Sequence, residues 1–469
     1  MKSPQAYLIG IKGVGMTMLA QFLAKSGYQI SGSDNVEEFM TDQVLRQAKI
    51  KVKAPFSPDN IPTGVDLIIY SSAGNASNNS ELAYIENHPE KFAGVRVITY
   101  AVALGELFNK YYGLAVCGSH GKTTTSAWLG YVLWRSGRQP NVLVGSRVPQ
   151  FRGSSLRGAS RYFVAEVDEY QNKLQYFKPQ GVILNNIDYD HPDFFKTPAD
   201  YNQVFVDFVK KIPDKGFLIF NEADSICRKI KKYCRGRSIG YSLARDFGRS
   251  RSDYIAYDER VDHKYQYFSL RYQGRPQGEF KIKLWGEHNI YNALAVIAAA
   301  RQLRVSWADI KRHLAGFQGT ERRAQVIGTY KESLIIDDYA HHPTEIKATL
   351  AGLRKRYAGQ RIITVFHPHT FTRTKALFQD FVSSFSQTDE LIILDIYGSA
   401  REKQGGVSSA ELAQAIKKRN EMARYAQKVR HIKTMPQVVN YLRKILKSDD
   451  LVVLMGAGDV FRIGQYLIK

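Results

Sequence analysis

Short hydrophobic runs recur along this chain, and most of them end in glycine or polar residues ahead of a helix-like segment. The predicted strands cover 6–9, 29–31, 66–70, 113–116, 162–166, 181–185, 333–336, 361–366, 390–394 and 451–455. Strands that alternate with helices are typical of parallel, doubly wound sheets. The pattern therefore predicts an α/β protein in which polar residues gather where the strands end.

The length of 469 residues exceeds what one hydrophobic core supports, so several domains are expected. The pattern predicts three, over 1–111, 112–318 and 319–469. The first and third are Rossmann-like, and the middle one is a P-loop-type domain with a parallel sheet. Residues 250–283 alternate apolar and polar positions, which predicts a small antiparallel patch in the middle domain. The Ala-rich segment Asn289–Leu303 predicts a buried helix.

The segment VCGSHGKTTTSAW at 116–128 predicts a phosphate-binding loop between a strand and a helix. Its turn consists of Gly118, Ser119, His120 and Gly121, and Lys122, Thr123 and Thr124 open the helix. Glycines let backbone N–H groups point at phosphates, and the helix N-terminus adds partial positive charge. Lys122 would reach the terminal phosphates and Thr123 would hold Mg²⁺. Val116 stands where the usual motif has glycine, so this is a shorter variant.

A second glycine turn, GIKGVG, follows the first predicted strand. Its glycines at 10, 13 and 15 do not fit the dinucleotide fingerprint, which would need a glycine at Lys12. Asp34 lies about twenty residues further on, where an acid usually meets a ribose hydroxyl. Ser72 follows another strand end. These residues predict a nucleotide diphosphate site, and a tight turn without a ligand is the alternative.

Carboxylates and histidines follow the phosphate loop at later strand ends. Glu166 and Asp168 close one strand, and His191 ends the polar turn NNIDYDH. Mg²⁺ takes oxygen ligands, and one or two carboxylates suffice. Each residue alone would also suit a helix cap or a structural role, but their order after a phosphate loop favours a metal-dependent site.

Three further polar clusters lie in the last third of the chain: Arg322 with Arg323, His341 with His342, and His367 with His369 and Arg373. An arginine that enters a phosphate site from a neighbouring domain contributes about 10³–10⁵ to the rate of phosphoryl transfer. The His-x-His pair lacks a third spaced ligand for zinc. An exposed arginine pair without a special role is the alternative for Arg322 and Arg323.

Composition indicates an ordinary globular protein, with 44% hydrophobic and 23% charged residues. The sequence has neither an apolar run of membrane-spanning length nor the pattern of a signal peptide, and its three cysteines suit a reducing compartment. A cytoplasmic location and no membrane partner are therefore expected. The formal charge of +22 favours anionic ligands. Because no nucleic-acid motif accompanies it, a solvated basic surface is preferred over a nucleic-acid partner.

The motifs together resemble the Mur ligase family over the whole chain. They are, in order, GIKGVGMTMLA with SGSD, GSHGKTTT, AEVDE, NNIDYDH, GEHNIYNALA, ERR, DDYAHHPTE and FHPHTFTRTK. The resemblance implies an ATP-dependent ligase of peptidoglycan synthesis, which serves cell-wall formation, cell shape and division. DDYAHHPTE and the PH-x-x-TRT segment favour the branch that joins L-alanine to the lactyl carboxylate of UDP-N-acetylmuramate through an acyl phosphate.

The resemblance also implies residue roles. The UDP site would comprise Gly10, Gly13, Val14, Gly15, Asp34 and Ser72. The ATP site would comprise Gly118, Ser119, His120, Gly121, Lys122, Thr123, Thr124, Asn289, Asn292, Arg323 and Asp338. Thr123 and Glu166 would bind a first Mg²⁺ and His191 a second, and His342, His369 and Arg373 would orient the amino acid. Lys122, Glu166, His191 and Arg323 would be the catalytic residues.

Four positions depart from the family pattern. Tyr170-Gln171 replaces a usual Ser-Asp, Thr370 stands where an Arg is common beside the amino-acid site, and Tyr100 stands where an Arg is common near the ATP domain. A tyrosine at position 170 resembles the pattern of the family's recycling ligase, which attaches a preformed tripeptide. That activity is therefore the first alternative. A nucleic-acid-binding ATPase and a non-catalytic nucleotide-binding regulator are alternatives of other classes. The expected oligomeric state is a monomer or a homodimer.

Overall fold

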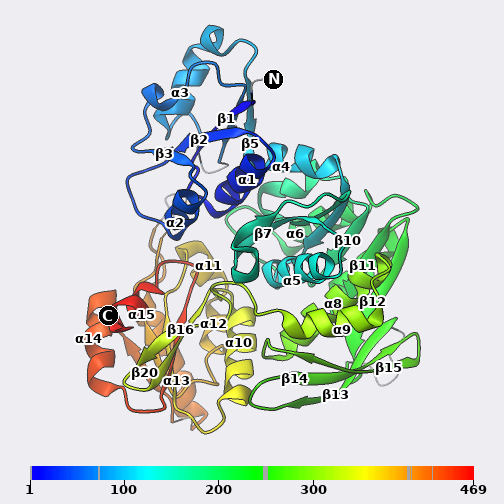
Figure 1. Cartoon of the computed structure of the whole chain (residues 1–469). Coiled ribbons are helices and arrows are strands. Elements are labelled where there is room, and N and C mark those ends of the chain that lie inside the picture. The colour runs from blue at the N-terminus through cyan, green and yellow to red at the C-terminus, as the bar shows by residue number, and fades with distance from the viewer. Residues whose placement is uncertain are drawn as a thin grey trace.

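A computed structural model describes residues 3–71, 74–246, 252–398, 402, 404–424 and 426–468. Its strands form three sheets that follow one another along the chain. Figure 1 shows them as three bodies: the N-terminal one in blue at the top, the central one in cyan and green, and the C-terminal one in yellow to red. The predicted α/β class is confirmed. Among the described residues, no helix has the length and apolar character needed to cross a membrane.

The N-terminal sheet is parallel, with strand order β3-β2-β1-β4-β5. Its strands are β1 (Gln5–Ile9), β2 (Gln29–Ser33), β3 (Lys51–Lys53), β4 (Leu67–Tyr70) and β5 (Arg96–Thr99), and its helices are α1 (Val14–Lys25), α2 (Met40–Gln47), α3 (Ser80–Asn87) and α4 (Tyr100–Asn109). The strand order reverses at β1 and β4, where a doubly wound sheet forms its ligand crevice. The turn at Gly10 lies at this crevice, because a Cβ there would approach the Cβ of Ser71 to 3.0 Å.

The central sheet has the order β15-β14-β13-β12-β11-β10-β6-β9-β7-β8. Its strands are β6 (Tyr112–Cys117), β7 (Asn141–Val148), β8 (Gly153–Leu156), β9 (Tyr162–Glu166), β10 (Gly181–Leu184), β11 (Phe217–Asn221), β12 (Arg237–Leu243), β13 (Tyr254–Val261), β14 (Gln266–Tyr272) and β15 (Arg275–Ile282), and its helices are α5 (Lys122–Arg135), α6 (Pro198–Val209), α7 (Ser225–Ile230), α8 (Glu287–Gln302) and α9 (Trp307–Gly316). The predicted antiparallel patch is confirmed, because β14 pairs antiparallel with both β13 and β15. It continues the main sheet, because β13 pairs in parallel with β12 before the antiparallel β14 and β15 follow.

The C-terminal sheet has the order β16-β17-β21-β18-β19-β20 and is parallel except for the antiparallel pair β16 and β17. Its strands are β16 (Gln325–Tyr330), β17 (Ser333–Asp338), β18 (Ile362–Phe366), β19 (Glu390–Ile393), β20 (Lys428–His431) and β21 (Leu451–Met455), and its helices are α10 (Pro343–Arg356), α11 (Phe371–Ala376), α12 (Phe378–Val382), α13 (Ser409–Met422), α14 (Met435–Ile445) and α15 (Arg462–Ile468). Strand β17 runs two residues beyond its predicted end, to the two aspartates of DDYAHHPTE.

The N-terminal and central sheets are joined through a shared apolar core. Helix α1 contributes Met18 and Phe22 to the hydrophobic cluster on one face of the central sheet. The Phe22 ring lies 5.4 Å from that of Phe163 on β9, and Lys25 donates to the carbonyl of Ser155 on β8 at 2.9 Å. Apolar burial of this kind fixes the glycine turn before α1 close to the carboxyl end of the central sheet.

Candidate functional site

Two cavities meet at the phosphate loop. One has a volume of about 650 Å³ and lies between the central and C-terminal sheets. The other has about 350 Å³ and is lined by residues from all three parts of the chain. His120 and Gly121 line both. Of the predicted site residues, the larger cavity is also lined by Thr124, Asn289, Asn292, Arg323 and Asp338. The smaller cavity is also lined by the predicted residues Val14, Ser119, Lys122, Thr123, Glu166, His191 and Arg323.

The phosphate loop needs its two glycines for conformation and for space. Gly118 and Gly121 have φ of +116° and +77°, which L side chains rarely adopt. A Cβ at Gly118 would lie 2.6 Å from the carbonyl oxygen of Asn186, and one at Gly121 would lie 2.5 Å from Oδ1 of Asn292. The loop therefore packs tightly against the turn after β10 and against α8, which places Asn292 directly behind it.

Lys122 is the first residue of α5, and its ammonium group folds over the loop. Nζ donates to the carbonyls of Gly118 at 2.6 Å and Ser119 at 3.1 Å, and to Oε2 of Glu169 at 3.1 Å. Burial by itself would lower the pKa of Lys122, but the carboxylates of Glu169, Asp168 and Glu166 outweigh it and raise the pKa. The lysine is therefore a fixed positive charge at the loop.

Glu166 ends β9 beside the first hydroxyl of α5. Thr123 donates from Oγ1 to Oε1 of Glu166 at 2.8 Å, and the backbone N–H of Gly145 donates to Oε2 at 2.7 Å. A Cβ on Gly145 would lie 2.7 Å from that oxygen, so glycine there lets the carboxylate approach the backbone of β7. The predicted pair of Thr123 and Glu166 thus lies together, with both side chains in the smaller cavity.

A second acidic group surrounds His191. Donor atoms of Asp168, Glu169 and His191 all lie within 4.8 Å of one another. Glu169 is 1% exposed and accepts from the Tyr201 hydroxyl at 3.0 Å. Carboxylate oxygens and an imidazole nitrogen are donors that suit a divalent cation. Sequence reasoning did not include Glu169, although the AEVDE motif places it one residue after Asp168.

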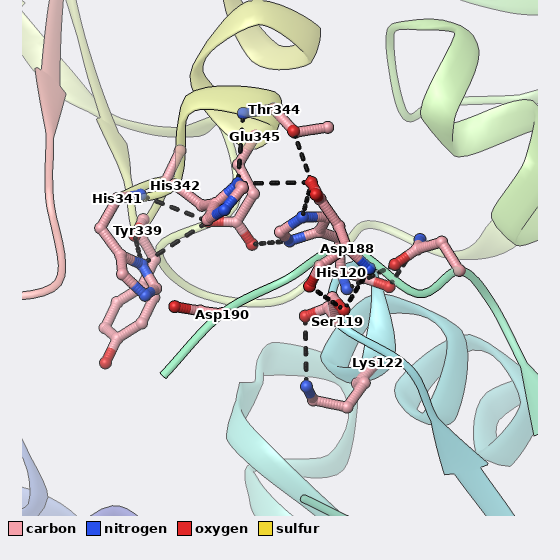
Figure 2. Close-up of polar contacts among 12 residues, drawn as sticks. Ser119, His120, Lys122, Asp188, Asp190, Tyr339, His341, His342, Thr344 and Glu345 are labelled. Atoms are coloured by element: carbon pink, nitrogen blue, oxygen red, sulfur yellow. Dashed lines mark hydrogen bonds and ion pairs between the residues drawn. The ribbon is translucent and has the colours of Figure 1, made fainter. Parts of the chain in front are cut away.

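His120 connects the loop to the C-terminal sheet. Its Nε2 lies 3.0 Å from Oδ2 of Asp188 and its Nδ1 lies 3.3 Å from Oε1 of Glu345. Thr344 donates to the same Asp188 oxygen at 2.6 Å, and Figure 2 shows the two carboxylates on either side of the imidazole. Burial would lower the pKa of His120, but the hydrogen bonds to both carboxylates raise it to about 9. Asp188 and Glu345 were not predicted, because their partners are distant in the sequence.

We expect this histidine to make the stability of the protein depend on pH. A group whose pKa is raised to about 9 on folding stabilises fully below its ordinary value of 6.5, and the contribution is lost as the pH rises through 9. The shift corresponds to about 3 kcal/mol. Thermal unfolding should therefore show a larger drop in midpoint between pH 6.5 and 9.5 for the wild type than for His120→Gln. Equal drops in both proteins would contradict a charged His120.

Burial favours the neutral form of three other histidines of the site, His341, His342 and His369. Burial lowers the pKa of His341 to about 3 and that of His369 to about 4, and it also lowers the pKa of His342. His342 caps α10 and lies with its ring 4.7 Å from that of His120. The ring of His341 lies 6.1 Å from that of His369, and Figure 2 shows it on the side of Asp190. The structure thus brings His341 close to His369, and it places the predicted His342 beside His120.

Arg373 forms a buried ion pair across the domain contact. Its Nε and Nη2 donate to the two oxygens of Asp190 at 2.9 and 3.3 Å, and the side chains are 6% and 10% exposed. Burial would raise the pKa of Asp190, but Arg373 holds it well below its usual value. Nη1 of Arg373 lies 3.5 Å from Nδ1 of His369. Arg373, which is predicted to orient the amino-acid substrate, is therefore bound to Asp190, the aspartate that precedes His191.

Removing Arg373 should lower the stability of the protein. We expect Arg373→Ala to lower the free energy of unfolding by about 3–5 kcal/mol, because it leaves the Asp190 carboxylate buried without a cation. The double variant Asp190→Asn with Arg373→Met should recover most of that stability without recovering activity. Denaturant unfolding and a turnover assay on the same samples separate the two effects. Full activity in the double variant would show that the pair has only a structural role.

The two neighbouring arginines at the start of the C-terminal sheet have different partners. Arg322 donates to Asp337 at 3.0 Å and to the carbonyl of Gly456 at 2.8 Å, so it holds the sheet edge together. Arg322 also lines the smaller cavity, whereas Arg323 faces both cavities, with Nη1 3.7 Å from Oε1 of Glu345. Asp338 accepts from the backbone of Ala324 at 2.7 Å, which fixes the turn that carries Arg323. Burial raises the pKa of Asp338 to about 6.

The predicted adenine residues are linked by hydrogen bonds. Asn289 donates to the carbonyl of Trp285 at 2.7 Å, and Asn292 donates to Oδ1 of Asn289 at 3.2 Å. Both asparagines line the larger cavity at the N-terminal end of α8. These hydrogen bonds within the chain therefore set the orientation of both side chains.

The N-terminal glycine turn is held in place by Asp34. Oδ2 of Asp34 accepts the backbone N–H of Lys12 at 2.7 Å, and Lys12 Nζ donates to the carbonyl of Glu37 at 2.7 Å. Gly13 precedes α1, and a Cβ on Gly15 would lie 2.8 Å from the Tyr100 hydroxyl. Asp34 therefore shapes the turn from within, while Val14 reaches the smaller cavity. The predicted Ser72 lies outside the described residues.

Comparison with known proteins gives consistent relatives for all three parts of the chain. Residues 5–112 match the family model described as Mur ligase family, catalytic domain, residues 116–300 match the Mur ligase middle domain, and residues 322–458 match the Mur ligase, glutamate ligase domain. The chain is 37% identical to the UDP-N-acetylmuramate–L-alanine ligase of Desulfitobacterium hafniense, over 98% of this chain and 99% of that protein. It is 35% identical to the enzyme of the same name from Caldanaerobacter subterraneus, over 100% and 98%.

Solved structures agree with this assignment at the level of the fold. The UDP-N-acetylmuramate-alanine ligase of Thermotoga maritima superposes with a TM-score of 0.80 at 22% identity, covering 99% of this chain and 98% of that one. A murein peptide ligase from Psychrobacter arcticus superposes with a TM-score of 0.72 at 25% identity and the same coverage. Both likenesses extend over all three sheets.

Proposed function

The chain belongs to the Mur ligase family, and from this we propose that it is an ATP-dependent ligase that joins L-alanine to UDP-N-acetylmuramate. The full-length identity of 37% to an enzyme of that name carries the proposal. The reaction would belong to peptidoglycan precursor synthesis. ATP and UDP-linked sugars are cytoplasmic metabolites, so we place the reaction in the cytoplasm. The monomer or homodimer expected from the sequence stays a prediction.

The chemistry requires a carboxylate to be activated before an amine can attack it. Transfer of the γ-phosphoryl group of ATP to the lactyl carboxylate gives an acyl phosphate and ADP. The amine of alanine then displaces phosphate and leaves an amide. Both reactants of the first step are anionic, so positive charge at the junction lowers its barrier. We assign that role to Lys122 and Arg323, which line the smaller cavity from opposite domains.

The two cavities suit the two nucleotides of this reaction. We propose that the larger one takes adenosine, beside Asn289, Asn292 and Asp338, and that the phosphates cross His120 and Gly121 toward Lys122. The sugar nucleotide would enter the smaller cavity from the N-terminal glycine turn, past Val14. The lactyl carboxylate would then lie between Lys122 and the acidic group.

Divalent cations fit the donor set of the smaller cavity. Thr123 and Glu166 would hold one Mg²⁺, and His191, together with the carboxylates of Asp168 and Glu169, would hold a second. When bound, Mg²⁺ supplies charge neutralisation for the phosphates and the carboxylate. The chain keeps these oxygens poised through Gly145 for Glu166 and through Tyr201 for Glu169.

The acceptor would bind where the C-terminal sheet meets His191. His369 and His341 are neutral, so each ring could accept a hydrogen bond from an ammonium or donate one to a carboxylate. Arg373 and Asp190 hold the two sides of this region together. Closer contact between the domains here would exclude water and so protect an acyl phosphate from hydrolysis.

A substrate-dependent phosphate-release assay tests the proposal. Purified protein with Mg-ATP, UDP-N-acetylmuramate and L-alanine should release phosphate and form an amide in equal amounts, and omission of either substrate should stop both. Phosphate release without the nucleotide sugar, or release stimulated by RNA or DNA, would reject the ligase.

The recycling ligase is the second candidate, favoured by Tyr170 and by the similarity to the murein peptide ligase of Psychrobacter arcticus. The same assay with L-alanyl-γ-D-glutamyl-diaminopimelate in place of L-alanine separates the two. We expect turnover with L-alanine, and turnover with the tripeptide alone would reverse the assignment.

A further inference from the structure

Tyr170 lies directly against the imidazole of His191. The two ring centroids are 4.6 Å apart with an interplanar angle of 35°. The Tyr170 hydroxyl donates to Oδ2 of Asp193 at 2.7 Å, two residues after the histidine. The tyrosine ring is thus tied to the same loop whose imidazole it covers, so it restricts rotation of that imidazole.

The same turn also holds a carboxylate of the acidic group. The backbone N–H of Tyr170 donates to Oδ1 of Asp168 at 3.0 Å, and Lys173 Nζ donates to Oδ2 at 2.8 Å. Lys173 lies 5.3 Å from the centre of the Tyr170 ring. One short segment, the 3₁₀ helix η4 (Tyr170–Tyr176), therefore orients both Asp168 and His191.

The backbone at this place is strained. Gln171, Asn172 and His191 have φ of 56°, 54° and 57°. Non-glycine residues in this region cost about 1–3 kcal/mol each and persist only where their surroundings enforce them. The N–H of Asn172 closes the turn by donating to the carbonyl of Glu169 at 2.9 Å. The strained turn therefore accompanies the close contact between the Tyr170 and His191 rings.

We infer that Tyr170 is a positioning residue, which fixes the His191 imidazole so that its Nε2 and the carboxylates of Asp168 and Glu169 form one divalent-cation site. The inference deepens the proposed function and rests on it. Side chains that orient a ligating histidine typically contribute 10–100-fold to metal affinity, because the ligand then loses no rotational freedom when the metal binds. Tyr170 itself would touch neither the cation nor the substrates.

A tyrosine that only fills space would behave differently. Its ring also packs against Phe194, with centroids 5.8 Å apart. If this packing were its whole role, loss of the ring would lower the unfolding midpoint and leave cation affinity unchanged in the folded protein. Cation affinity and thermal stability therefore have to be measured on the same variants.

The test uses Mn²⁺ as a spectroscopic substitute for Mg²⁺ and needs no turnover. Free Mn²⁺ is titrated into the full-length protein and followed by electron paramagnetic resonance. We expect Tyr170→Ser to raise the Kd for Mn²⁺ about tenfold and Tyr170→Phe, which keeps the ring, to stay within about twofold of the wild type. Tyr176→Ser is the matched control, because that tyrosine lies in the same 3₁₀ helix with a side chain that is 38% exposed, and it should bind Mn²⁺ like the wild type.

Each outcome decides a separate point. An unchanged Kd in folded Tyr170→Ser overturns the positioning role, as does an equal loss in Tyr176→Ser. Wild-type protein that binds Mn²⁺ no better than His191→Ala overturns the cation assignment and the inference with it, whereas the ligase itself stands or falls by amide formation. In turnover, Tyr170→Ser should need more Mg²⁺ for half-maximal rate, with the KM for L-alanine unchanged. A fall in kcat that saturating Mg²⁺ does not restore would also count against the inference.

Discussion

Lys122→Ala is expected to lower the ligase rate by about 10³-fold, because the variant loses a fixed positive charge where two anions have to meet. The wild-type ammonium is held by two loop carbonyls and by Glu169, so it is oriented before any substrate binds. Kinetics of phosphate release with Mg-ATP, UDP-N-acetylmuramate and L-alanine measure the effect. The loss should fall on kcat more than on the KM for ATP, since the charge is needed most as the phosphoryl group is transferred.

Two controls make this result specific. Removing Lys122 leaves Glu169 buried beside the loop, so thermal unfolding must be recorded to separate lost stability from lost catalysis. Lys122→Arg keeps the charge but not its position, and should remain at least tenfold below the wild type. Lys210→Ala removes an exposed lysine that pairs with Asp207 on α6, and should leave the rate unchanged. Near-normal turnover in a folded Lys122→Ala protein would remove the lysine from the mechanism.

Glu166→Ala is expected to lower turnover by about 10²–10³-fold at Mg²⁺ concentrations that saturate the wild type. Its carboxylate is held by Gly145 on one oxygen and by Thr123 on the other. Loss of the acid would remove the carboxylate that we assign to the first cation. Higher Mg²⁺ should restore part of the rate, and a titration of rate against Mg²⁺ measures this recovery.

Glu166→Gln separates charge from shape. The amide can still accept from one donor, so the local backbone should be retained while the negative charge is lost. We expect the glutamine variant to resemble the alanine variant in activity and the wild type in unfolding midpoint. Glu279→Gln serves as the control, because Glu279 pairs with Arg260 on the exposed surface of the central sheet. Wild-type Mg²⁺ dependence in Glu166→Gln would place the cation elsewhere.

Much of the fold could be predicted from the sequence because the central strands of its sheets are buried on both faces. Strands such as β10 and β21 consist entirely of buried residues, so they appear as continuous apolar runs with helices between them. The limits of strands were less clear where polar residues continue the ladder. Asp337 and Asp338 still belong to β17, because their backbones pair with β21 although the side chain of Asp338 lines the larger cavity.

The local part of the site was also predictable. A glycine turn with a lysine and a threonine encodes its own geometry, since the groups that bind phosphate are a few residues apart. The glycines at 118 and 121 indeed have the positive φ that such a turn requires. Roles that depend on partners far along the chain were not predictable. Examples are Asp190, which meets Arg373, and Asp188 and Glu345, which meet His120.

The sequence by itself determined the class of fold, the phosphate loop and the kinship with a family, because each depends on short-range periodicity or on motifs that carry their own conformation. Tertiary structure alone decided which acid stands beside which base. Only the tertiary structure brought His341 close to His369, bound Arg322 to Asp337 while Arg323 lines both cavities, and placed the Tyr170 ring against His191. The physical reason is that side-chain electrostatics and stacking act over a few ångströms of space, and sequence distance does not encode that separation.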